Sequence, residues 1–329
     1  MGPRATIEIG LNAAIVAVRE TTPLILVVDG PDTPDMLPSG PFDPVGHRTM
    51  EMGLRNWVAE QTGLTLGYVE QLYTFGDRGR QPQPGDRGPF AVSVGYLALT
   101  QAGQHTPDEA PGPARWRDWY TYFPWEDWRA GRPPILDARV APALDAWVAQ
   151  APETSGDEAA PSPARPLSRA DRARVWFGRE GRDWDEERVL ERYELLYEAG
   201  LVAEAARDRP ERVTVPAVAD DAPPLGRAMA QDHRRILATA IGRLRAKLKY
   251  RPVIFELLPE TFTLFELQRT VESLLGLHLH KQNFRRLVEN RGLVQPTGGV
   301  QARTGGRPAK LYRFRRAVLH ERPAPGLKV

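Results

Sequence analysis

Residues 263–314 read TLFELQRTVESLLGLHLHKQNFRRLVENRGLVQPTGGVQARTGGRPAKLYRF, and this stretch decides the fold of the C-terminal part of the chain. Thr263 and Glu266 have the spacing of a capping box, in which each side chain satisfies a free backbone N–H group at the start of a helix. Apolar residues follow at helical spacing, and Gly292 is placed to end a second helix. Short apolar runs then flank a glycine-rich basic loop. Two helices and a hairpin in this order predict a winged helix-turn-helix, whose second helix enters the major groove of DNA.

Basic and amide side chains are concentrated in the second predicted helix and in the loop after it. From Lys281 to Arg316 the chain has ten Lys or Arg residues and one acidic residue, Glu289. A basic helix face is often only a solvated surface. Here the cations gather on one side, and amides that suit base edges lie among them. We therefore expect the following side chains to bind double-stranded DNA: Lys281, Gln282, Asn283, Arg285, Arg286, Arg303, Arg307 and Lys310.

The charge of the chain is divided between its two ends. The 329 residues carry a net charge of +2. Residues 225–329 hold 21 Lys or Arg and 7 Asp or Glu, a net charge of +14, so residues 1–224 carry a net charge of −12. This asymmetry favours a nucleic-acid-binding end joined to a part with another role. The chain has no cysteine, which excludes disulfides, thiol nucleophiles and cysteine-bound metals. With no signal core and no apolar run of membrane length, we expect a soluble cytoplasmic protein without a membrane partner.

Short β-branched runs flank one loop–helix unit in residues 6–150, a pattern that predicts α+β packing. The loop–helix GPFDPVGHRTMEMGLRNWVAEQTGL, residues 40–64, resembles the Nudix box G-x5-E-x7-R-E-U-x-E-E-x-G-U, where U is apolar. The glutamates of that box hold Mg²⁺ against a diphosphate. Counted back from Gly63, the glutamate pair is Glu60 and Gln61. Aligned instead with Arg55 on the arginine of the box, His47 takes the earlier glutamate position, at the cost of one extra residue before Gly63. At most one box glutamate remains, so we expect no catalytic residues, no hydrolysis and no bound metal.

Three further stretches make the resemblance more specific. LYTFGDRGR at 72–80, VSVGYLAL at 92–99 and DHRRILATAIGRLRAKLKYRPVIFELLPETFTLFELQ at 232–268 resemble the Nudix-related transcriptional regulators of NAD metabolism, the NrtR and NadQ branches. The resemblance implies a Nudix-like α/β/α sandwich that senses a nucleotide (ADP-ribose, NAD or ATP), followed by a winged helix that represses genes of NAD synthesis or salvage. It also implies a homodimer on a palindromic operator, with an effector nucleotide but no required cofactor.

Two groups of residues are candidates for binding that nucleotide. Asp77, Arg78 and Arg80 lie in a glycine-rich loop between two predicted strands, where guanidinium groups could bind phosphate. A solvated hairpin tip is the alternative there. The Nudix-like cleft would be lined by His47, Arg48 and Glu60, which could hold phosphate or ribose without cleaving the ligand.

The sequence between the two ends predicts a connector. Residues 6–150 are expected to form the ligand-sensing domain, residues 151–228 Pro/Ala-rich loops and helices, and residues 229–329 the DNA-binding domain, beginning with a long helix over 229–249. Seven aromatic side chains between Trp116 and Trp128 are expected to fill a core or a dimer seam.

Two other functions compete with the repressor hypothesis. An active Nudix pyrophosphatase with an accessory DNA-binding domain would need a metal site rebuilt from Glu51, Asp77 or Asp86. A protein-interaction adaptor would not account for Gln282 and Asn283 among the cations.

Overall fold

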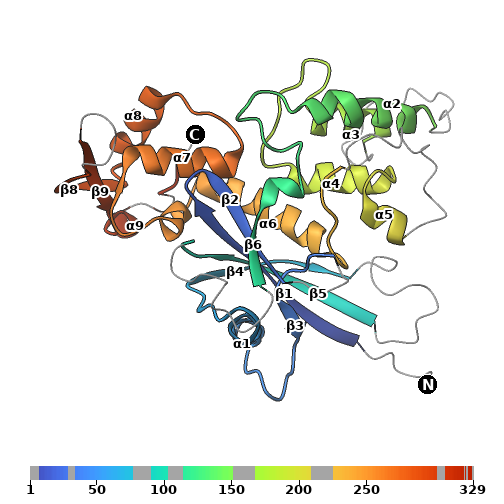
Figure 1. Ribbon diagram of the computed structural model, residues 1–329, viewed down its shortest axis with the longest axis horizontal. Helices are drawn as coiled ribbons and strands as arrows, with labels where there is room; N and C mark the ends of the chain where they lie inside the picture. The colour runs from blue at the N-terminus through green and yellow to red at the C-terminus, as the bar shows by residue number, and fades with distance from the viewer. Residues whose placement is uncertain are drawn as a thin grey trace.

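A mixed β-sheet forms the centre of the N-terminal part (Figure 1). Its strand order is β4–β5–β1–β2–β6, with β3 paired to β1, and β1 and β5 run parallel while the other pairs are antiparallel. The strands are β1 (Ile7–Arg19), β2 (Thr22–Val28), β3 (Ser39–Pro41), β4 (Tyr68–Phe75), β5 (Phe90–Leu99) and β6 (Ala114–Asp118). The computed structural model describes residues 7–28, 34–76, 90–102, 114–150, 167–208, 225–301, 308–321, 323 and 325–327.

Both faces of this sheet are buried, because successive side chains of a strand point to opposite sides. On β1, Ala14 and Val16 belong to one hydrophobic cluster, and Ala13 and Ile15 belong to the other. Helix α1 (Met50–Thr62) covers the second face, and helix α6 (His233–Leu248) covers the first, so the sheet lies between them in Figure 1. The predicted α/β/α sandwich is confirmed. Its second helical layer comes from a segment that we had assigned to the DNA-binding domain.

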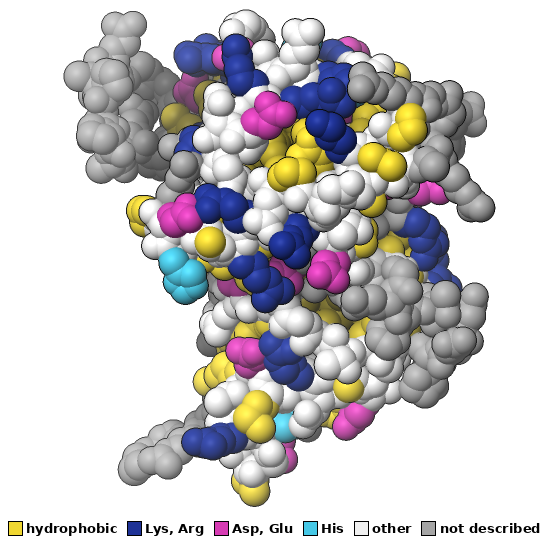
Figure 2. All heavy atoms as spheres, turned by 90° about the vertical axis from the view of Figure 1, so that its left-hand side faces the viewer, with side chains coloured by type: hydrophobic (Ala, Val, Ile, Leu, Met, Phe, Trp, Pro, Cys, Tyr) yellow, Lys and Arg dark blue, Asp and Glu magenta, His cyan; other side chains and the backbone are white. Residues whose placement is uncertain are grey.

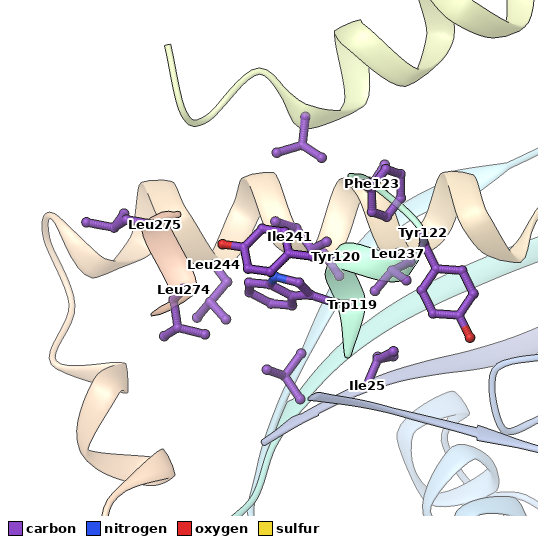
Figure 3. Packing of buried hydrophobic residues seen from close by; sticks show 14 of the residues in the cluster. Ile25, Trp119, Tyr120, Tyr122, Phe123, Leu237, Ile241, Leu244, Leu274 and Leu275 are labelled. Carbon is purple, nitrogen blue, oxygen red and sulfur yellow. The ribbon is translucent and has the colours of Figure 1, made fainter. Parts of the chain in front are cut away.

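The aromatic stretch after β6 packs between α6 and the sheet. Trp119, Tyr122, Phe123 and Trp125 are completely buried. Figure 3 shows the ring of Trp119 beside Leu244 and Ile241 of α6, with Ile25 of β2 below it. Leu274 and Leu275 of helix α7 (Leu264–Leu275) lie in the same cluster, on the side away from Tyr122. The predicted core role of these aromatics is therefore confirmed.

Four helices form a further layer on the far side of α6. They are α2 (Ala141–Ala149), which continues a π-helical turn at Leu136–Val140, α3 (Arg169–Trp176), α4 (Val189–Glu198) and α5 (Ala203–Asp208). Helix α4 packs along α6, with Tyr193 and Leu196 fully buried. The helices predicted within the connector are thus present. Its first predicted loop, residues 151–166, lies outside the described residues. The second was predicted over residues 207–225, but Arg207 and Asp208 belong to α5, and residues 209–224 lie outside the described residues.

The C-terminal part is a winged helix-turn-helix. It contains β7 (Phe262–Thr263), α7, α8 (Lys281–Arg291), β8 (Val294–Gln301), β9 (Ala309–Phe314) and α9 (Val318–Glu321), and its three strands are ordered β7–β9–β8. The capping box at the start of α7 is present. The Glu266 backbone N–H donates to Thr263 Oγ1 at 3.1 Å, and the Thr263 N–H donates to Glu266 Oε2 at 2.7 Å. Gly276 and Gly292 end α7 and α8 with φ of 72° and 58°, a left-handed conformation that glycine adopts without strain.

The charge asymmetry of the sequence has a second explanation in the fold. Cations of α6 and of the residue after it pair with acidic residues of the sheet domain and of the connector, all within residues 1–224. The pairs are Arg234–Glu204, Arg235–Glu194, Arg245–Glu126, Lys247–Glu70, Lys249–Glu186 and Lys249–Glu187. The net +14 of residues 225–329 therefore overstates the charge available for DNA, because part of it holds α6 against the rest of the protein.

Candidate DNA interface and nucleotide cleft

Helix α8 presents a polar face whose orientation is set by two buried side chains. Phe284 and Val288 are 2% and 0% exposed and pack into the core, and Leu287 is partly buried beside them. The remaining side chains of the first turns are exposed: Lys281, Gln282, Asn283, Arg285 and Arg286. All five belong to the predicted DNA-binding set, and the structure brings them together on one helix. Glu289 is also exposed, nearer the end of the helix.

A buried carboxylate fixes the turn between α7 and α8. Glu272, 3% exposed, accepts hydrogen bonds from the Leu279 backbone N–H at 3.0 Å and from Gln268 Nε2 at 2.8 Å. Gln268 Nε2 also donates to the Leu279 carbonyl at 2.9 Å. Burial raises the pKa of Glu272, but the hydrogen bonds from Leu279, Gln268 and His278 lower it more, and the pKa lies below its ordinary value. This role of Glu272 was not predicted from the sequence, although the i, i+4 pair of Gln268 and Glu272 beside the apolar face of α7 was an available signal.

Of the three residues predicted to bind DNA in the wing, the structure describes one, Lys310. Strands β8 and β9 pair from Val294–Phe314 to Gln301–Ala309, and Lys310 is exposed on β9. The other two residues predicted in the wing, Arg303 and Arg307, lie outside the described residues. Figure 2 faces the side of the molecule on which the winged helix lies, and dark blue Lys and Arg side chains recur across its upper half with acidic side chains between them.

The predicted Nudix-like cleft lies around α1. The helix begins after Thr49, whose Oγ1 accepts from the Met52 N–H at 3.1 Å. His47 and Arg48 precede the helix, and His47 Nδ1 accepts from the Asp43 N–H at 3.2 Å. Glu60 is exposed near the other end, and ten residues of helix rise about 15 Å. A ligand that contacts all three predicted residues would therefore have to extend along α1. The loop residues Asp77, Arg78 and Arg80 lie outside the described part of the chain.

In the register counted back from Gly63, Trp57 and Gln61 occupy two positions where the Nudix pattern has glutamates. Both side chains hydrogen-bond to β3 and so join α1 to it. Gln61 Oε1 accepts from the Ser39 N–H at 3.0 Å, and Gln61 Nε2 donates to the Ser39 carbonyl at 2.7 Å. Trp57 Nε1 donates to the Pro41 carbonyl at 2.9 Å. The Trp57 ring lies against Gly40, where an added Cβ would come within 2.3 Å of ring atoms. Within the described ranges, no group of three or more His, Asp or Glu is arranged to hold a metal ion.

The geometry defines a class of protein with a Nudix-like sandwich and a winged helix that exposes a basic, amide-bearing helix. Residues 254–314 match the family described as the NrtR DNA-binding winged helix domain. A curated relative from Acinetobacter baylyi, named "ADPR responsive transcriptional repressor NtrR", is 42% identical over 86 residues. That match covers 26% of this chain and spans about a third, 34%, of the relative.

Solved structures extend the likeness to the whole chain. The structure of Shewanella oneidensis NrtR complexed with a 27mer DNA has a TM-score of 0.54 at 20% identity, and the match covers 95% of both chains. A MutT/nudix family protein from Enterococcus faecalis has a TM-score of 0.51 at 15% identity, covering 96% of this chain and 89% of that one. These likenesses show the fold. The fold of the chain is similar to that of NrtR, as the sequence resemblance predicted, and residues 254–314 match the NrtR winged helix family.

Among the described residues, no helix combines the length and the apolar composition needed to cross a membrane.

Proposed function

We propose that this protein is a nucleotide-responsive transcriptional repressor that binds operator DNA through α8 and the wing. The observation that carries the proposal is the exposed basic and amide face of α8, within the segment that matches the NrtR winged helix domain. In this proposal residues 229–329 hold the DNA-binding winged helix together with α6, which packs it onto the sheet; residues 6–150 sense the nucleotide, and residues 151–228 connect the two parts. A homodimer would place two copies of α8 on a palindromic operator of genes for NAD synthesis or salvage.

ADP-ribose is the first effector to test, because the curated relative is named as responsive to ADPR. NAD and ATP remain alternatives, since all three share an adenylate and a diphosphate or longer phosphate chain. The proposed nucleotide-binding residues are His47, Arg48 and Glu60 along α1, together with the loop residues Asp77, Arg78 and Arg80.

The proposed sensing domain binds its nucleotide without hydrolysing it. Support comes from Gln61 and Trp57, because neither side chain can serve as a carboxylate ligand and both are engaged with β3. The test is incubation with Mg²⁺ or Mn²⁺ and ADP-ribose, NAD or ATP. We expect no turnover. Hydrolysis faster than about one turnover per second, an ordinary enzymatic rate, would instead show a pyrophosphatase.

The DNA-binding proposal assigns different tasks to the helix and the wing. Asn283 lies early in α8, where side chains of a recognition helix reach base edges. Lys310 is exposed on β9, and we assign it a contact with phosphate. Asn283→Ala should lower the discrimination between operator and scrambled DNA by about 1–3 kcal/mol, the usual value of a base contact. Lys310→Ala should weaken both duplexes alike and make the salt slope shallower by about one unit.

Fluorescence anisotropy measures both effects. The operator is a genomic fragment that the wild-type protein itself selects, and the control is a scrambled duplex of the same length. Isotherms at several salt concentrations give the affinity, the specificity ratio and the salt slope for each variant. The assignment is reversed if Lys310→Ala changes the specificity ratio while Asn283→Ala weakens both duplexes equally.

A further inference from the structure

The buried end of α7 is held by hydrogen-bond donors that lie outside the winged helix. A helix leaves its last carbonyls without partners inside the helix, and a buried carbonyl needs a donor. Ser273 and Leu274, near the end of α7, are completely buried. The Tyr120 hydroxyl donates to the Ser273 carbonyl at 2.7 Å, and Arg245 Nε of α6 donates to the Leu274 carbonyl at 2.8 Å. In Figure 3 the Tyr120 hydroxyl points toward the side on which Leu274 lies.

The chain that leaves α7 lies directly against the same aromatic segment. The Trp128 backbone N–H donates to the Gly276 carbonyl at 2.8 Å. A Cβ added to Gly276 would lie 2.3 Å from the Glu126 carbonyl oxygen and 2.9 Å from the Tyr120 hydroxyl, so only glycine allows this approach. We refer to Tyr120, Trp128 and Arg245, whose donors bind three carbonyls at the end of α7, as the platform of the winged helix.

The platform is continuous with an edge strand of the sheet. Asp118, the last residue of β6, pairs with Leu24 of β2, and its Oδ1 accepts from the Tyr120 backbone N–H at 2.9 Å. Two residues before Asp118, the side chain of Trp116 packs against the hydrophobic cluster on the α1 side of the sheet. Strand β6 therefore contacts the α1 side, where the nucleotide is proposed to bind, and leads directly to the residues that hold the end of α7.

The end of α7 in turn determines where α8 points. Helix α8 begins at Lys281, five residues after Gly276, and the turn between the two helices is fixed by the hydrogen bonds of Glu272 to Leu279 and Gln268. A change in how α7 lies on the platform would therefore move α8 with it, without any change in the side chains that α8 exposes.

Tyr120 is the platform residue whose side chain can be changed with least disturbance. Its ring belongs to the buried aromatic core, and its hydroxyl accepts from Arg245 Nη2 at 3.4 Å while it donates to Ser273. Burial raises the pKa of Tyr120, so the hydroxyl keeps the proton that it donates. We propose that the platform sets the orientation of α8 on the sheet, with Tyr120 as a positioning residue, and that nucleotide bound along α1 changes DNA binding through it. The second part of this proposal rests on the proposed function.

Hydrogen exchange followed by mass spectrometry tests the first part on the full chain, without DNA or nucleotide. Tyr120→Phe removes one hydroxyl and keeps the ring, so the Ser273 carbonyl loses this donor. The matched control is Tyr197→Phe, which removes a similarly buried hydroxyl that bonds Asp208 of α5. A second variant, Gly276→Ala, places a methyl group against the platform and displaces the end of α7.

We expect the amides of residues 276–283 to exchange about tenfold faster in Tyr120→Phe, because a buried carbonyl has lost its donor. Exchange in β1 should stay within twofold of wild type, which separates local loosening of the turn from general loss of stability. Gly276→Ala should give the same pattern, and Tyr197→Phe should leave residues 276–283 unchanged. The first part is overturned if Tyr120→Phe leaves these amides within twofold of wild type, or if it accelerates β1 equally.

Anisotropy titrations on operator DNA, with and without ADP-ribose, test the second part. The measured quantity is the ratio of the two Kd values, which expresses the coupling between nucleotide and DNA. In Tyr120→Phe this ratio should move toward one by about threefold or more, while the Kd for ADP-ribose without DNA stays within twofold of wild type. Lower stability alone would not change the ratio, and Tyr197→Phe should keep the wild-type value.

A wild-type ratio in Tyr120→Phe, or an equal change in Tyr197→Phe, would overturn the second part. Failure of the proposed function is distinguishable from this result, because it appears in the wild type itself. If wild type does not bind DNA, or if its DNA binding does not respond to ADP-ribose, NAD or ATP, the proposed function and the second part fail together. Hydrogen exchange decides the first part in either case.

Discussion

Substitution of Glu126 tests how the helical layer is held to the winged helix. The side chain is 1% exposed and accepts from Arg192 Nε at 2.6 Å, Arg192 Nη2 at 2.9 Å and Arg245 Nη1 at 2.7 Å. Both arginines are completely buried, and Arg245 also bonds the Leu274 carbonyl of α7. Glu126→Gln keeps the size of the side chain and removes its charge, so two buried guanidinium ions lose their common counter-ion.

The expected loss of unfolding free energy is about 3 kcal/mol. Breaking a buried ion pair from one side costs about 3–5 kcal/mol, and the Gln amide oxygen can still accept one of the three hydrogen bonds, which places the value at the lower end. Urea unfolding followed by tryptophan fluorescence measures it. Arg132→Gln breaks the exposed pair with Asp137 and should cost less than about 1 kcal/mol. If Glu126→Gln costs no more than this control, the buried network does not hold the layers together and the reasoning is wrong.

Three further predictions concern stability. Glu272→Gln should lower the free energy of unfolding by about 1–2 kcal/mol at neutral pH, because it weakens the hydrogen bond from the Leu279 N–H. Because the folded protein lowers the pKa of Glu272, this contribution is present above about pH 4.3 and is lost as the pH falls through the folded pKa. Urea titrations of wild type and Glu272→Gln should therefore converge at acid pH. Burial lowers the pKa of His233 to about 4, so the unfolded chain binds a proton at a higher pH than the folded chain does. The free energy of unfolding should therefore fall by up to about 3 kcal/mol between pH 6.5 and pH 4. In the same urea titrations, His233→Gln should reduce this dependence of stability on pH. Gln61→Ala removes two hydrogen bonds to Ser39 and should cost about 1–2 kcal/mol, and an unchanged thermal transition would contradict a structural role for Gln61.

The winged helix could be predicted from sequence because its signals are local. The capping box at Thr263 and the glycine that ends α8 act within a few residues, and both are present in the structure. The apolar, β-branched run at Ile15–Val18 predicts only a short strand, but β1 runs from Ile7 to Arg19. The earlier residues of β1 include Gly10 and Asn12, which do not favour a strand by themselves, and the strand is extended by pairing with β5 over Ile7–Val16. Tertiary pairing outweighed local propensity there.

The packing of α6 on the sheet could not be predicted from its position in the chain. A helix was predicted over residues 229–249 as the beginning of the DNA-binding part, and the structure has it from His233 to Leu248. Its apolar residues, among them Ile236 and Ile241, pack on the sheet and on α4, and most of its cations pair with acidic residues far away in sequence. The hydrogen bonds from Arg115 and Arg227 to the buried Asp35 could likewise not be predicted, since Asp35 lies 80 residues from Arg115 and 192 from Arg227.

Predictions about the two candidate sites differ in how far sequence could support them. The face of α8 follows from helical periodicity once Phe284 and Val288 are taken as buried, so its exposed residues could be named from sequence. The nucleotide cleft depends on how loops meet around α1, and periodicity carries no information about that. The sequence shows that this chain lacks glutamates that the Nudix pattern requires. It does not show that Gln61 and Trp57, at two of those positions, form hydrogen bonds with β3.

The central claim, a repressor whose DNA binding responds to a nucleotide, is tested most directly by one titration. A fluorescent duplex of the genomic fragment selected by the protein is held at half-saturation, and ADP-ribose is added while anisotropy is recorded, with adenosine as the control. We expect binding to the fragment in the absence of ligand, a steep loss of that binding with salt, and a saturable change of anisotropy with ADP-ribose but not with adenosine. Anisotropy that stays constant with ADP-ribose, NAD and ATP alike, or binding that does not distinguish the fragment from scrambled DNA, would contradict the account.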